Sequence, residues 1–155
     1  RLVAMLQKYF DGEVPARAEL TESDQAIDAL AVSVTERADA AIAAFAPHEA
    51  IASVWELVDA LNGYITEQAP WALAKDDAER ERLGTVLTTA LRGLGTVTVL
   101  LSPVMPKATE KLWASIGAGG SVAEQRVDRA YEWQGASHVV PLESGLFPRI
   151  EQVSA

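Results

Sequence analysis

The residues best suited to chemistry lie in one short stretch, which runs from Asn62 through Glu67 and Gln68 to Pro70 and Trp71. It places polar side chains at the end of an expected helix and an aromatic ring directly after a helix-stopping proline. A tryptophan at such a corner can present its flat face to an unstacked nucleotide, and base–aromatic stacking contributes about 1–3 kcal/mol per base. A nearby arginine could then read a base edge with its planar donors. The alternative is structural: the ring closes the end of a helical bundle, and the proline only turns the chain.

Other kinds of active site find little support in the sequence. The chain has no Cys, which excludes disulfides and thiolate metal sites, and its two His, His48 and His138, lie in unrelated contexts. No Glu-x-x-His pattern of a di-metal bundle occurs. Gly93 and Gly95 lie inside an apolar run rather than after a strand, so they do not form a phosphate-binding loop. We therefore expect no metal ligands and no catalytic residue in this chain.

Charge and hydropathy narrow the classes of function further. The 155 residues include 13 Lys and Arg against 22 Asp and Glu, a net charge of −9, which excludes nucleic-acid binding through a broad basic surface but not a small reading site. Residues 1–75 hold 5 basic and 12 acidic residues, so the half with the aromatic corner is the more acidic one. No apolar run approaches the ~20 residues of a membrane span, and no signal peptide opens the chain. We expect a cytoplasmic protein with no membrane partner.

The apolar spacing predicts the helices that must position the corner. Long helices are predicted over about 24–45, 47–68 and 76–101, and shorter ones ending at residue 10, over 105–117 and within 122–131. Thr21 and the acids after it give the first long helix its start signature. Gly63 lies inside the second and costs about 1 kcal/mol in propensity, so we expect it to permit a close approach or to serve a site.

These elements predict one fold class and a two-part organisation. The class is all-α, a bundle of about five helices with an irregular C-terminal appendage. Residues 1–117 form the predicted bundle, and residues 118–155 form an extension that docks back on the bundle or on another part of the protein. The β-branched residues 97–99 would also suit a strand, but the length of the apolar run favours a helix.

A family resemblance becomes visible in three stretches of this sequence. They are Lys-Tyr-Phe-Asp-Gly at residues 8–12, Ala-Leu-Asn-Gly-Tyr-Ile-Thr-Glu-Gln-Ala-Pro-Trp-Ala-Leu-Ala-Lys at residues 60–75, and Leu-Ser-Pro-Val-Met-Pro at residues 101–106. The closing Leu-Phe-Pro-Arg-Ile-Glu at residues 146–151 is similar to the C-terminal peptide of the same family. Through these stretches, and in order over essentially the whole chain, the sequence resembles the C-terminal anticodon-binding region of bacterial methionyl-tRNA synthetases, which are class I aminoacyl-tRNA synthetases.

The resemblance implies roles for four residues. In the family, the Trp after the Gln-Ala-Pro turn stacks on the first anticodon base, a cytosine; here it is Trp71, and Pro70 shapes the same pocket. A family Arg that helps to read the anticodon matches Arg1, and its partner Asn falls four positions before the first residue. Asn62 matches a family Asn on the helix that leads to the site. Thr66 stands where many members have an acid, so the role of that acid does not carry over.

The resemblance also implies the function and the partners. The expected function is recognition of the tRNA(Met) anticodon by part of an enzyme that attaches methionine to its tRNA using ATP. The chain starts at Arg1 inside an apolar-periodic run and lacks the ATP-site motifs of the family, so we expect a fragment without a catalytic site. ATP with Mg, and methionine, are expected in a separate N-terminal catalytic domain. Two alternatives stay open: the anticodon domain of another class I synthetase, and a helical interaction module with no RNA role, which the net charge favours.

Overall fold

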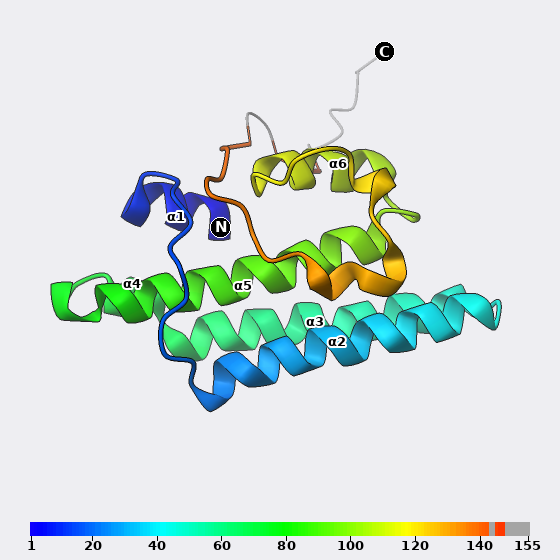
Figure 1. Ribbon diagram of the computed structural model, residues 1–155, viewed down its shortest axis with the longest axis horizontal. Coiled ribbons are helices and arrows are strands. Elements are labelled where there is room, and N and C mark those ends of the chain that lie inside the picture. The colour runs from blue at the N-terminus through cyan, green and yellow to red at the C-terminus, as the bar shows by residue number, and fades with distance from the viewer. Residues whose placement is uncertain (143–144, 148–155) are drawn as a thin grey trace, which may run out of the picture.

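The computed structural model describes residues 1–142 and 145–147, and these residues form an all-helical fold (Figure 1). The α-helices in this part of the chain are α1 (Leu2–Phe10), α2 (Glu22–Ala43), α3 (Pro47–Gln68), α4 (Pro70–Leu73), α5 (Arg80–Leu101) and α6 (Pro106–Ser115). Three short 3₁₀ helices are η1 (Asp77–Glu79), η2 (Val122–Glu124) and η3 (Val127–Glu132). The predicted all-α class is confirmed. The structure describes six α-helices rather than about five, because Pro70–Leu73 forms a helical turn of its own.

The long helices α2, α3 and α5 lie side by side, and α1 and α6 cover α5 on the side away from α2 and α3 (Figure 1). The inner faces of these helices form the core, whose largest fully buried side chains include Leu6, Leu57, Leu87, Leu91 and Trp113. Helix α5 is buried over most of its circumference, as its long apolar run predicted. The expectation that no apolar run approaches the length of a membrane span is wrong for residues 77–101, which are long and apolar enough to cross one. However, 89% of the most apolar 18-residue stretch of this segment is buried inside the bundle, so these residues form its core helix.

Capping side chains determine where two of the helices begin. Helix α2 begins at Glu22, two residues earlier than predicted, because Thr21 and Asp24 form a capping box. The long helix predicted from Asp76 is divided: the Asp76 carboxylate accepts the Ala78 amide at 3.0 Å and caps η1, and the regular helix begins at Arg80. The β-branched residues 97–99 remain helical, as the length of the run indicated.

The glycines of the long helices have two different roles. In α5, a Cβ on Gly95 would overlap the ring of Trp133, and a Cβ on Gly84 would meet Pro15, so these glycines permit close packing. In α3, a Cβ on Gly63 would meet no atom within 4 Å. The prediction that Gly63 permits a close approach within the fold is therefore wrong for the described residues.

The segment after α6 packs against the bundle and fastens α1 to it. The predicted short helix within 122–131 forms the two 3₁₀ helices η2 and η3 instead. The Trp133 ring lies 5.4 Å from the Trp113 ring, and Val139 is fully buried. The Val139 amide donates to the Gly12 carbonyl at 2.8 Å, and the Val140 amide donates to the Ser115 carbonyl at 2.8 Å. The division at residue 117 stays a prediction, and most of the closing stretch, residues 148–151, lies outside the described residues.

Candidate nucleic-acid interface

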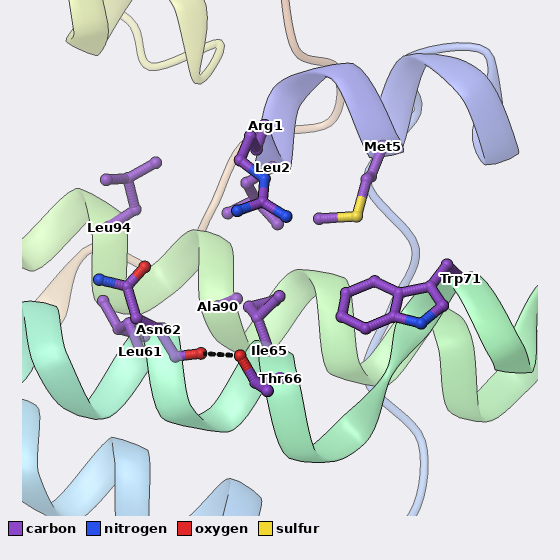
Figure 2. Close-up of a pocket in the computed structure, with 10 residues that line it drawn as sticks. All are labelled: Arg1, Leu2, Met5, Leu61, Asn62, Ile65, Thr66, Trp71, Ala90 and Leu94. Atoms are coloured by element: carbon purple, nitrogen blue, oxygen red, sulfur yellow. Dashed lines mark hydrogen bonds between the residues drawn. The ribbon is translucent and has the colours of Figure 1, made fainter.

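Three of the four residues that the resemblance singled out line one pocket of about 350 Å³ (Figure 2). Arg1 comes from the start of α1, Asn62 from α3 and Trp71 from α4, so segments far apart in the sequence build the pocket together. The rest of the lining is Thr66 and six apolar residues: Leu2, Met5, Leu61, Ile65, Ala90 and Leu94. Pro70 does not line the pocket; it is buried at the first position of α4, directly before Trp71.

The Trp71 ring is available for contact from outside. Its side chain lies at one end of the pocket beside Met5, while Asn62 lies at the other end and the Arg1 guanidinium lies between them in the view of Figure 2. Trp71 is 44% exposed, whereas Trp113 in the core is 2% exposed. A ring that only closed the end of the bundle would be covered, so Trp71 has a face open to a ligand.

The polar groups of the pocket suit a planar, uncharged ligand. Arg1 is the one charged side chain in its lining, and no carboxylate from the described residues lines it. The Arg1 guanidinium offers only donors, while the Asn62 amide offers both donors and an acceptor. The Thr66 hydroxyl donates to the Asn62 carbonyl at 2.8 Å, which leaves its oxygen free to accept. An aromatic face beside a few donors and acceptors is the arrangement with which proteins bind a splayed-out base. Among the described residues, no group of three His, Cys, Asp or Glu could hold a metal ion.

The corner that presents Trp71 has an unusual backbone. Ala69 adopts left-handed φ and ψ angles of 44° and 60° and serves as both the C-cap of α3 and the N-cap of α4. Its amide donates to the Ile65 carbonyl at 3.2 Å, and Pro70 occupies the first position of α4, where its missing N–H costs nothing. A non-glycine residue in this region costs roughly 1–3 kcal/mol and persists only where its surroundings hold it.

A buried polar network at the bundle end supplies that support. Asp24 has no exposed surface, and it accepts hydrogen bonds from the Tyr64 hydroxyl, from the Thr21 amide at 2.8 Å and from both terminal nitrogens of Arg82 at 2.5 and 3.0 Å. Arg82 also donates to the Gln68 side chain at 2.6 Å. The start of α2, the end of α3 and the start of α5 are therefore joined at the base of the Trp71 corner.

The charges of this network are fixed by its hydrogen bonds. Burial raises the pKa of Asp24, but the hydrogen bonds from Arg82, Tyr64 and Thr21 outweigh burial and lower the pKa from 3.8 to about 2. Burial, and then the Asp24 carboxylate, raise the pKa of Tyr64, so the phenol stays a donor. The sequence indicated Asp24 only as an acid in the first turn of a helix. Its partners come from α3 and α5, and no spacing along the chain predicts that contact.

Comparison with known protein families assigns the chain. A family model described as the anticodon-binding domain of tRNA ligase matches residues 24–144. The methionine–tRNA ligase of Streptomyces coelicolor is 43% identical over 164 aligned positions, which cover 100% of this chain and 30% of that protein. Methionine–tRNA ligase 1 of Bacillus cereus is 33% identical, over 97% of this chain and 23% of its own length. The chain thus spans less than a third of these relatives.

Solved structures agree with the sequence comparison. The crystal structure of free Mycobacterium tuberculosis methionyl-tRNA synthetase superposes with a TM-score of 0.86 at 29% identity, over 97% of this chain and 30% of that one. A second structure of the same synthetase, bound by methionyl-adenylate, gives a TM-score of 0.85. By sequence and by fold, the chain belongs to the family of anticodon-binding domains of tRNA ligases and corresponds to that domain of the methionyl-tRNA synthetases.

Proposed function

We propose that the pocket of Arg1, Asn62 and Trp71 reads the anticodon of tRNA(Met). The observation that carries the proposal is their convergence: Arg1 and Trp71, which match reading residues of the family, and Asn62, which matches a family Asn on the helix that leads to the site, come from three separate elements and line one pocket. The exposed face of Trp71 adds to it, because stacking needs an accessible ring and no net positive charge on the protein. A domain with a net charge of −9 must depend on such directed contacts.

The proposed roles follow from the chemistry of each side chain. The first anticodon base, a cytosine, stacks on Trp71, and Pro70 fixes the corner beneath it. The Arg1 guanidinium donates to acceptor atoms on the base edge, and the Asn62 amide can accept from the exocyclic amino group of the cytosine. Stacking supplies the affinity, while the hydrogen bonds distinguish one base from another.

We further propose that the chain acts within a methionine–tRNA ligase. Its relatives by that name are more than three times as long as the part they share with it. ATP with Mg, and methionine, would bind in an N-terminal catalytic domain, to which the anticodon domain presents the tRNA. Within the chain, residues 1–117 would form the anticodon-binding bundle, and residues 118–155 would be an extension that docks back on the bundle or on the catalytic domain. Such an enzyme works in the cytoplasm.

The test is a substitution at Trp71 in the intact enzyme. Trp71→Ala removes the stacking face, so kcat/KM for tRNA should fall by about 5- to 150-fold, equivalent to about 1–3 kcal/mol. Formation of the adenylate without tRNA should stay at the wild-type rate. Trp55→Ala is the matched control, because Trp55 is 55% exposed on α3 and does not line the pocket.

Two outcomes would count against the proposal. If adenylate formation and tRNA charging fall equally, Trp71 has a structural role. If Trp71→Ala lowers kcat/KM for tRNA no more than Trp55→Ala does, this pocket is not the reading site. Charging a panel of purified tRNAs distinguishes tRNA(Met) from the substrates of other class I synthetases.

A further inference from the structure

One guanidinium group, that of Arg82, connects both ends of the corner that carries Trp71. Gln68 is the last residue of α3, and Arg82 lies in the first turn of α5. Arg82 Nη2 donates to Gln68 Oε1 at 2.6 Å, which closes residues 69–81 into a loop with fixed ends. The short helix α4, with Trp71 at its second position, lies inside this loop.

The Arg82 end of this link is firmly anchored. Its two terminal nitrogens donate to the two oxygens of the Asp24 carboxylate as a bidentate pair, with a salt bridge of 2.5 Å. The Arg82 side chain is only 20% exposed. Asp24 is held in turn by Tyr64 and Thr21. A bidentate pair fixes direction as well as distance, so Arg82 is a rigid point from which Gln68 can be positioned.

Gln68 links Arg82 to the start of the corner, but its side chain does not line the pocket. It is absent from the pocket lining, and its other contact is from Nε2 to the Ser23 hydroxyl at 3.2 Å. Ala69, which follows it, is strained twice: its φ is positive, and a residue before proline prefers an extended backbone. If Gln68 were released, Ala69 could relax to that backbone, and Pro70 and Trp71 would turn away with it.

We propose that Gln68 and Arg82 are positioning residues for anticodon recognition: their hydrogen bond holds the Trp71 ring in its binding orientation before RNA arrives. The proposal rests on the proposed function, since it assigns Trp71 a base to stack on. Binding to an already ordered corner avoids the entropic cost of ordering it. The Gln of the Glu-Gln-Ala-Pro-Trp stretch then acts through the loop it closes rather than by contact with the base.

The test compares Gln68→Ala with Gln68→Glu in the intact protein. Alanine removes the acceptor for Arg82 but leaves the Arg82–Asp24–Tyr64 contacts intact, whereas glutamate keeps an acceptor at the same place. Arg37→Ala is the matched control, because Arg37 pairs with Glu56 at 2.7 Å between α2 and α3, away from the corner. One readout is the dissociation constant for an anticodon stem-loop. The other is the ¹⁹F NMR line of Trp71 in protein labelled with 5-fluorotryptophan, assigned by its loss in Trp71→Phe.

We expect Gln68→Ala to weaken stem-loop binding by about three- to tenfold, the range of one net hydrogen bond, and to shift and narrow the Trp71 line in the free protein. Gln68→Glu should restore both, and Arg37→Ala should change neither. An unchanged Trp71 line in folded Gln68→Ala protein overturns the proposal, as does weakened binding that Gln68→Glu fails to restore. The proposed function fails separately, if Trp71→Ala itself leaves stem-loop binding unchanged. The NMR readout needs no RNA, so it tests the role of the Gln68–Arg82 hydrogen bond whether or not the proposed function holds.

Discussion

The Asp24 carboxylate gives the network at the base of the corner a measurable pH dependence. Its pKa is lowered from 3.8 to about 2 in the folded protein. That difference corresponds to about 2 kcal/mol of stability at neutral pH, at roughly 1.4 kcal/mol per pKa unit. Because the folded pKa is the lower one, the contribution is fully present above pH 3.8 and is lost as the pH falls through 2; about half should remain at pH 3.

Asp24→Asn removes this charge while keeping the size of the side chain. The amide has one acceptor oxygen where the carboxylate has two, and it carries no charge, so a partly buried guanidinium loses its counter-charge. We expect the free energy of unfolding at pH 7 to fall by about 2 kcal/mol or more, measured by urea denaturation followed by circular dichroism. Between pH 5 and pH 3, the gap between wild type and variant should stay near its full size down to pH 3.8 and then narrow to about half. A gap that stays constant over this range would refute the reasoning, because the stabilisation would then not come from the ionised carboxylate.

Three further substitutions test the packing, each by thermal or urea denaturation. Gly63→Ala should raise the free energy of unfolding by up to about 1 kcal/mol, since its Cβ meets open space on a regular helix; a loss of stability would contradict this. Gly95→Ala should lower it by about 1–3 kcal/mol, since the new Cβ displaces the Trp133 ring; a neutral result would mean that the ring moves freely. Ser115→Ala should cost about 1 kcal/mol by removing the 2.7 Å bond to the Val140 carbonyl, and unchanged hydrogen exchange near Val140 would argue against that role.

Much of the fold could be predicted from local signals. Helix α3 has the bounds predicted from its apolar stripe and from the prolines at each end, because Pro47 and Pro70 set its limits regardless of tertiary context. The region after residue 117 was predicted less well. Its 3₁₀ helices and the pairing of Glu13 with His138 depend on contacts across the whole chain, which periodicity does not reveal.

The candidate site was predictable in part and for different reasons. Trp71 stood out from the sequence because a proline-terminated helix followed by a tryptophan is unusual, and the resemblance to a family supplied Arg1 and Asn62. The residues that hold the corner were not predictable. Gln68 and Arg82 meet across the end of the bundle, 14 positions apart in the sequence, and Asp24 lies 58 positions from Arg82. For Gly63, the predicted close approach is absent from the described fold, and the other interpretation, that it serves a site, stays a prediction.

The central claim is that this pocket recognises the first anticodon base, and binding of matched stem-loops tests it most directly. The intact protein should bind a stem-loop with the anticodon CAU about 10-fold or more tightly than one with a changed first base, at the same salt concentration. Trp71→Ala should weaken binding of the CAU stem-loop and reduce that ratio towards one. Equal affinity of the wild-type protein for the two stem-loops would contradict the account.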